Sequence, residues 1–136
     1  MNAFDKLMSY DPSKIVPQKK TVKRKLQRLN NLELEFELVE ISTEEMSKLQ
    51  AETMGLNVNG EVRMNLYDPS IKKILYGCPL FSNKELVVRF GCQTPKDLIS
   101  KILNKGDMDF LTAEIDKLSG FDPTKELQDK EEIENL

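Results

Sequence analysis

The chain has 136 residues and a formal net charge of −3, with 39% hydrophobic and 32% charged residues. This length predicts one domain, because domains commonly contain about 100–150 residues. The sequence has no His and no Trp, which removes imidazole as a general base and as a metal ligand. It also lacks a glycine-rich phosphate-binding motif and a Cys-x-x-Cys pair. We therefore expect neither an enzyme nor a protein that needs a cofactor or metal.

The sequence also predicts where the protein resides. Residues 1–6 show neither the basic nor the apolar part of a secretion signal. No stretch approaches the roughly 20 apolar residues that span a membrane. We expect a cytoplasmic protein with no membrane partner. Cys78 and Cys92 should serve there as small buried hydrophobic residues, because a reducing compartment disfavours disulfides.

Charge is unevenly distributed along the chain. Residues 122–136 hold six acids and two lysines, whereas residues 14–28 hold seven basic residues and no acid. Such a basic segment can bind nucleic-acid phosphates, or it can face acidic residues of a neighbouring strand. It contains no aromatic residue for base stacking, so intramolecular pairing is favoured over nucleic acid. The basic residues are Lys14, Lys19, Lys20, Lys23, Arg24, Lys25 and Arg28.

Residues 1–21 are expected to form a flexible arm. Pro12 interrupts this arm and Pro17 makes its last part a linker. Such a segment is either disordered or folds only against a partner. Its first part is a short amphipathic stretch that contains Phe4, Leu7, Met8 and Tyr10.

Residues 22–41 carry the clearest strand pattern, because apolar and charged residues alternate on both sides of Asn30. Asn tolerates the left-handed backbone of a tight turn, so we predict a β-hairpin. A three-residue loop would place Leu26 opposite Leu34 and Lys23 opposite Glu37. This register matches apolar pairs on one face and opposite charges on the other, and we therefore predict it.

A two-stranded hairpin is only marginally stable by itself in water. It must pack on helices or pair with a neighbouring subunit. The candidate edge for self-association is the first strand, with Val22, Arg24, Leu26 and Arg28.

The chain after the hairpin is predicted to be helical, and residues 56–66 are left open between loop, strand and helix. The predicted helix starts lie at Ser42, Asp68, Ser82, Thr94 and Asp107, which are residues that cap helices. The predicted ends lie at Gly55, Gly77, Gly91, residues 104–106 and Gly120, with Phe121 folding back on Ile115. The fold class is α+β, an N-terminal β-hairpin followed by four or five short packed helices. Residues 22–121 form the domain, and residues 122–136 form an acidic mobile tail.

Apolar residues crowd between positions 80 and 90. They can fill the core between short helices, or they can form an apolar groove for a partner helix. The candidate partner-binding residues are Leu80, Phe81, Leu86, Val87 and Phe90.

Short motifs follow one another in a particular order and spacing after residue 78. They include Pro79-Leu80, Phe90-Gly91-Cys92, Thr94-Pro95-Lys96-Asp97-Leu98-Ile99 and Leu118-Ser119-Gly120-Phe121. This order and spacing resemble the XkdN-like phage tail assembly chaperones, from contractile-tailed phages and prophages of Gram-positive bacteria. The helix-stop glycines Gly91, Gly106 and Gly120 contribute most to the resemblance. Together with the hairpin and its following helix, the resemblance covers residues 22–121.

The resemblance implies a non-enzymatic protein that binds the tape measure protein, keeps it soluble and helps recruit tail tube subunits. It also implies self-association and, in many phages, a frameshifted longer form of the same protein. Such a protein works in the cytoplasm of the bacterial host and is absent from the mature virion. Two alternatives stay open at this point. One is a structural tail or adaptor subunit retained in the virion, and the other is a nucleic-acid-binding accessory protein that uses residues 14–28.

Overall fold

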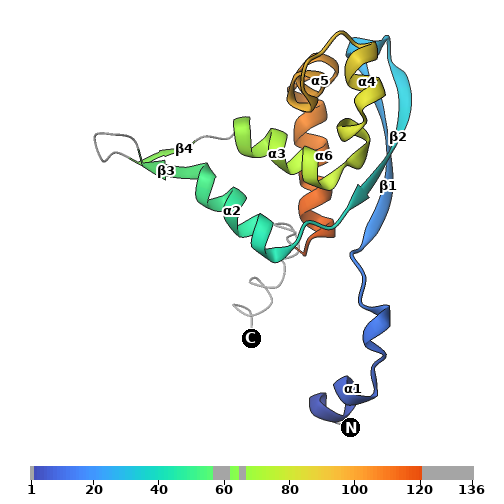
Figure 1. Cartoon of the computed structure of the whole chain (residues 1–136), viewed down its shortest axis with the longest axis vertical. Coiled ribbons are helices and arrows are strands. Elements are labelled where there is room, and N and C mark those ends of the chain that lie inside the picture. The colour runs from blue at the N-terminus through green and yellow to red at the C-terminus, as the bar shows by residue number, and fades with distance from the viewer. Residues whose placement is uncertain (1, 57–61, 65–66, 121–136) are drawn as a thin grey trace, which may run out of the picture.

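The structure is a computed structural model and describes residues 2–56, 62–64 and 67–120. A long hairpin covers one side of a group of helices, and an N-terminal segment projects away from this domain (Figure 1). This arrangement confirms the predicted α+β class. The helical elements are α1 (Ala3–Ser9), η1 (Pro12–Lys14), η2 (Gln27–Leu29), α2 (Thr43–Thr53), α3 (Tyr67–Gly77), η3 (Pro79–Ser82), α4 (Lys84–Arg89), α5 (Pro95–Ile102) and α6 (Lys105–Leu118). The strands are β1 (Lys19–Leu26), β2 (Leu32–Val39), β3 (Met54–Leu56) and β4 (Val62–Met64).

The strands β1 and β2 pair antiparallel, with Leu26 opposite Leu32 and Lys23 opposite Glu35. The predicted register, with Leu26 opposite Leu34, is therefore wrong by two residues. Side chains alternate between the two faces of a strand, so a shift of two residues keeps every side chain on its predicted face. The apolar face lies against the helices, and the Lys–Glu face lies toward solvent.

The connection between β1 and β2 explains the error in register. It contains the turn of 3-10 helix η2 and then Asn30 and Asn31, so it is longer than the predicted three residues. Both asparagines have left-handed backbone, with φ of 56° and 61°. Asparagine tolerates left-handed backbone, so the sequence predicts a turn at these residues. The alternation of apolar and charged residues gives no sign of the additional helical turn η2.

The hydrophobic core lies between the hairpin and helices α3, α5 and α6. Phe36 of β2 and Phe81 of η3 are both fully buried, and their rings stack with centroids 6.0 Å apart. Helices α3 and α6 approach closely at Gly77, where an added Cβ would lie 2.7 Å from Ile115 Cδ1. The other fully buried side chains of the core are Leu26, Leu38, Ile74, Cys78, Leu98, Ile99, Leu103, Leu111 and Ile115.

Two predicted helix starts are confirmed by their capping hydrogen bonds. The Ser42 hydroxyl accepts from the Glu45 N–H at 3.2 Å at the start of α2. The Thr94 hydroxyl accepts from the Asp97 N–H at 3.2 Å at the start of α5. Such a bond satisfies one of the unpaired N–H groups that begin every helix.

Two other predicted starts are wrong by one to three residues. Ser82 belongs to η3, and the side chain of Asn83 caps α4 by accepting from the Leu86 N–H. The last helix begins after Asn104 and not at Asp107. In both cases an Asn takes the cap position, because its side-chain oxygen accepts a backbone N–H as Ser or Asp would.

Residues 54–64 contain a second, short antiparallel pair, β3 with β4, in which Met54 lies opposite Met64. Residues 62–64 therefore form a strand, one of the three structures (loop, strand or helix) that the sequence left open for residues 56–66. Helix α3 begins at Tyr67, one residue before the predicted cap Asp68. Boundaries of this kind commonly shift by one or two residues.

Left-handed glycines end α4 and α6 as predicted. Gly91 has φ of 71° and Gly120 has φ of 95°, a conformation that favours glycine over other residues. The predicted contact of Phe121 and the predicted tail at residues 122–136 lie outside the described residues.

Candidate protein-interaction surface

The structure divides the five predicted partner-binding residues into three groups. Phe81 and Val87 are buried, with 0% and 7% of their surface exposed. Leu86 and Phe90 are half-buried and pack against the core. Leu80 is exposed, at 41%. The structure therefore brings these residues together around η3 and α4, but it directs only part of them outward.

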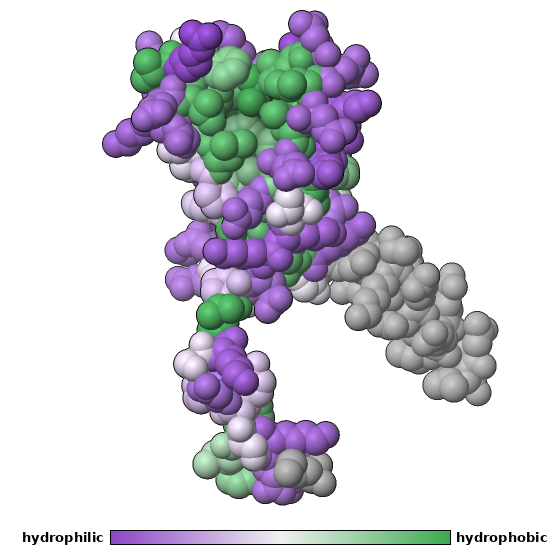
Figure 2. Space-filling view, turned by 90° about the vertical axis from the view of Figure 1, so that its right-hand side faces the viewer, coloured by the Kyte–Doolittle hydropathy of each residue, from purple (hydrophilic) through white to green (hydrophobic). Residues whose placement is uncertain are grey.

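The exposed apolar surface also includes residues that the sequence interpretation missed. Val88 on α4 is 76% exposed, and Leu32 at the start of β2 is 53% exposed. Figure 2 shows hydrophobic residues gathered on the upper half of one face, the end of the domain at which α4 and α5 lie in Figure 1. Consecutive residues of a helix point about 100° apart, so the burial of Val87 turns Val88 outward.

A depression of about 360 Å³ lies between η3 and the hairpin, and we call it the η3 depression. Its apolar part comes from Val39, Pro79 and Leu80, and three charged residues complete its lining. This combination suits an apolar side chain of a partner with polar groups at its edge. The charged lining residues are Lys19, Glu35 and Glu37.

The side chains of the predicted self-association edge lie against the chain itself. Val22 and Leu26 are buried in the core. The Arg28 guanidinium donates from Nη1 to the carbonyl oxygens of Ser100 and Leu103 at 2.7 and 2.8 Å, where α5 ends. A cation is favourable at that place because carbonyl groups carry the negative end of the helix dipole. Pairing of β1 with another subunit would therefore use its backbone and not these side chains.

Arg24 joins β1 to the start of α6. Its Nε donates to Asp107 Oδ1 at 2.6 Å, and Asp107 is 1% exposed. The other Asp107 oxygen accepts from the Asn104 N–H at 3.0 Å, while the Asn104 side chain accepts from the Asp107 N–H at 2.9 Å. The guanidinium of Arg24 lies 4.9 Å from the centroid of the Phe110 ring. This cluster ties the hairpin to α6 and satisfies the capping positions of that helix.

Further basic residues of segment 14–28 also have acidic partners within the chain. Lys20 Nζ lies 2.6 Å from Glu114 Oε2, and Lys23 Nζ lies 3.5 Å from Glu35 Oε1. Lys19 Nζ lies 3.9 Å from a carboxylate oxygen of the opposite strand. These contacts support the predicted intramolecular pairing. A lysine that already faces a carboxylate is also less available to neutralise a nucleic-acid phosphate.

A broad, open depression of about 750 Å³ lies beside the hairpin turn and the start of α6. Three of its basic lining residues, Lys23, Arg24 and Lys105, each have an acidic partner. The local charge is therefore largely balanced, and the depression does not single out an anionic ligand. Its remaining lining residues are Lys25, Gln27, Asn31, Asn104 and Gly106.

Both cysteines are free thiols, and they differ in burial. Cys78 is fully buried, and this burial raises the pKa of its thiol to about 11. At pH 8 roughly one Cys78 thiol in a thousand is then ionised, and only the thiolate reacts readily. We expect iodoacetamide at pH 8 to modify the half-buried Cys92 and to leave Cys78 unmodified until the protein is denatured, as measured by the mass of the intact chain. Equal rates at the two thiols in the folded protein would contradict this placement.

Two further observations concern sites of other kinds. Within residues 2–56, 62–64 and 67–120, no three His, Cys, Asp or Glu side chains gather so as to hold a metal ion. Among the helices in this part of the chain, none has the length and apolar content needed to cross a membrane.

A hairpin packed on short helices, with apolar side chains exposed around η3 and α4, fits a small domain that binds other proteins. The chain belongs to the phage XkdN-like tail assembly chaperone family, whose model matches residues 4–134. The match extends beyond residues 22–121, the range of the resemblance in the sequence motifs. No curated protein and no solved structure matches the chain. Its general role is therefore that of a chaperone in phage tail assembly, which takes place in the host.

Proposed function

We propose that this chain binds the tape measure protein, keeps it soluble during tail assembly and helps recruit tail tube subunits. It acts by binding and not by catalysis, it self-associates, and it leaves the tail before the virion is complete. Membership of the tail assembly chaperone family supports this role. The exposure of Leu80 at the wall of the η3 depression is the observation that supports this depression as the client-binding surface.

The arrangement around η3 suits a client with apolar helical segments. An amphipathic helix presents apolar residues on one side, and an apolar groove can accept several of them at once. Phe81 and Val87 anchor η3 and α4 in the core, so Leu80 and Val88 project from elements with fixed positions. A surface on fixed elements loses little conformational entropy when a client binds.

The substitution Leu80→Asp tests the proposal. We expect it to lower the soluble fraction of a tape measure protein co-expressed from the same genome several-fold, because a carboxylate at this position opposes burial of an apolar client. The fold should be unchanged by circular dichroism and thermal unfolding, since Leu80 lies at the surface. The matched control is Tyr76→Asp on α3, where an equally exposed apolar residue (48%) lies outside the η3 depression. Equal solubility of the client with Leu80→Asp and with the unchanged chain would refute this surface.

A further inference from the structure

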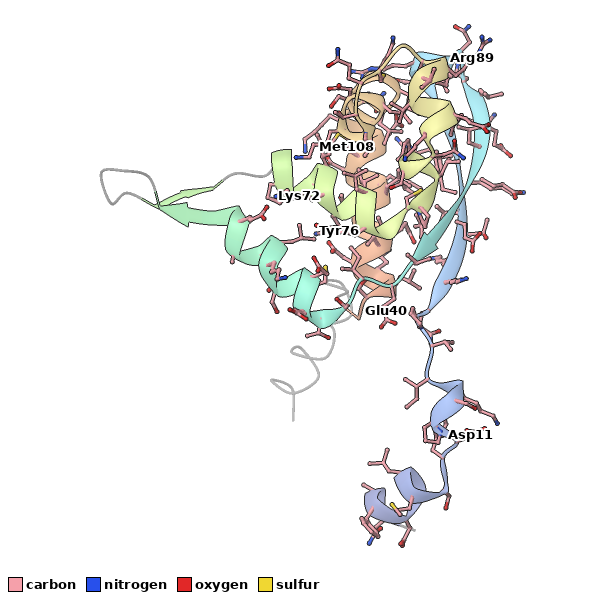
Figure 3. All side chains as sticks on the ribbon, viewed as in Figure 1. Asp11, Glu40, Lys72, Tyr76, Arg89 and Met108 are labelled. Atoms are coloured by element: carbon pink, nitrogen blue, oxygen red, sulfur yellow. The ribbon has the colours of Figure 1, made fainter. Side chains whose placement is uncertain are left out.

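The segment of residues 2–18, which precedes β1, projects away from the domain, and we call it the projecting segment (Figure 1). Every one of its residues is exposed. Figure 3 shows Asp11 on this segment, well below Glu40, which directly follows β2. Six large apolar side chains lie within thirteen residues, a density that marks an interface and not an ordinary solvated segment. They are Phe4 (68% exposed), Leu7 (75%), Met8 (72%), Tyr10 (52%), Ile15 (75%) and Val16 (60%).

The projecting segment has local order although its side chains are exposed. The Asn2 side chain caps α1 by accepting from the Asp5 N–H at 2.9 Å. The Asp11 carboxylate caps η1, accepting from the Ser13 hydroxyl at 2.8 Å and from the Ser13 N–H at 3.0 Å. These two bonds from Ser13 also lower the pKa of Asp11. The segment therefore presents its exposed apolar side chains from locally ordered turns, and exposed apolar surface of this kind marks a site of interaction with another molecule.

The part of the projecting segment next to β1, with Ile15 and Val16, cannot fold back onto the η3 depression of its own chain. Gln18 is held to Glu40, whose N–H donates to the Gln18 carbonyl at 2.8 Å, and Lys19 already lines the depression. Pro17 fixes its own φ and restricts Val16 to extended backbone, so the chain leaves the domain in an extended course. Ile15 and Val16 lie within about 7–11 Å of contour from Gln18, too short a distance for a reversal of direction.

We propose that the projecting segment docks into the η3 depression of a second copy of this chain, in a reciprocal exchange. In a two-fold dimer each copy offers the same segment and the same depression, so both apolar segments are covered at once. Aromatic side chains bury about 150–250 Å² each when fully covered. Two segments, each with Phe4 and Tyr10 and four aliphatic residues, bury on the order of 1,000 Å², the lower size of a specific interface.

This inference deepens the self-association in the proposed function by naming the segment and the surface that carry it. It also predicts that client and projecting segment compete for Leu80, since both use the η3 depression. The test uses the purified full chain without any client. Failure of the exchange can then be separated from failure of client binding.

Sedimentation equilibrium of the purified chain measures the exchange. We expect a dimer for the unchanged chain and about a hundredfold or more weaker dimerisation for the double variant Leu7→Asp with Ile15→Asp. Leu80→Asp should weaken dimerisation by a similar factor, because Leu80 lines the depression that receives the projecting segment. The matched controls are Lys6→Ser on the projecting segment and Tyr76→Asp outside the depression, and both should remain dimeric. A monomeric unchanged chain would overturn the exchange, and so would a double variant that dimerises as well as the unchanged chain.

A cross-link shows whether the contact joins two copies. A tagged chain with Ile15→Cys is mixed with an untagged chain with Leu80→Cys, both carrying Cys92→Ser, under mild oxidation. The buried Cys78 should not compete, because its thiol is shielded. We expect a disulfide-linked pair of one tagged and one untagged chain, absent when Tyr76→Cys replaces Leu80→Cys. Equal cross-linking at positions 80 and 76 would overturn the assignment to the η3 depression.

Discussion

Replacing Phe81 with alanine should lower the free energy of unfolding by about 3–5 kcal/mol, as measured by urea denaturation. Phe81 is fully buried and stacks on Phe36 of β2, so its loss leaves a cavity between η3 and the hairpin. The cost combines the lost transfer of the ring from water with the unfilled space. A change of this size can unfold much of a domain whose total stability is about 5–15 kcal/mol.

The neighbouring substitution Leu80→Ala is the matched control for Phe81→Ala. Leu80 is exposed at 41%, so its truncation should cost less than about 1 kcal/mol. The two residues differ in burial and not in sequence neighbourhood. If Phe81→Ala were as mild as Leu80→Ala and instead weakened client binding, Phe81 would belong to the surface and the packing of η3 would be wrong.

Replacing Arg24 with alanine should cost about 3–5 kcal/mol, because it leaves the carboxylate of Asp107 buried without its cation. Asp107 is 1% exposed, and the Arg24 Nε lies 2.6 Å from its Oδ1. The remaining bond from the Asn104 N–H only partly compensates a buried charge. The substitution also removes the guanidinium that lies over Phe110. Chemical denaturation at neutral pH measures the loss.

Lys23→Ala provides the comparison for Arg24→Ala on the same strand. Lys23 pairs with Glu35 across 3.5 Å, and both side chains are more than 60% exposed. Exposed pairs of this kind contribute about 0–1 kcal/mol. Equal and small losses for Arg24→Ala and Lys23→Ala would contradict the buried pair and free Arg24 for a role at the surface.

In the hairpin, the sequence pattern predicted the face on which each side chain lies but not the register of the two strands. The alternation of apolar and charged residues predicted that Leu26 points toward the core and Lys23 toward solvent, because side-chain direction along a strand has a period of two. The same alternation cannot separate registers that differ by two residues. The register depends on the length of the connection, and the turn of η2 before Asn30 carries no periodic signal.

The candidate surface was harder to predict than the fold. Leu80 and Phe81 are adjacent apolar residues, and only their positions on η3 decide which one meets Phe36. The pairing of Lys23 with Glu35 follows from strand pairing, since both lie in the hairpin. The pairing of Arg24 with Asp107 joins residues 83 positions apart, so local sequence patterns could not predict it.

Phe4, Leu7, Met8 and Tyr10 predict an amphipathic N-terminal segment that is either disordered or folds only against a partner. Its capping bonds and the exposure of these side chains became visible only in the structure. Composition measures how apolar a segment is, but not whether another part of the chain covers it. The exposure of these side chains in the structure is the basis for the proposed reciprocal exchange, which the sequence pattern alone does not predict.

The most direct test of the proposed chaperone function is a tagged pull-down from cells in which the phage genes are induced, with mass spectrometry of the bound proteins. We predict recovery of the tape measure protein, a long helical protein, together with this chain, and absence of this chain from purified virions. Recovery of nucleic acid in its place, released by moderate salt, would contradict the proposal and direct attention to residues 14–28. Presence of this chain in purified virions would contradict it as well, in favour of a structural tail subunit.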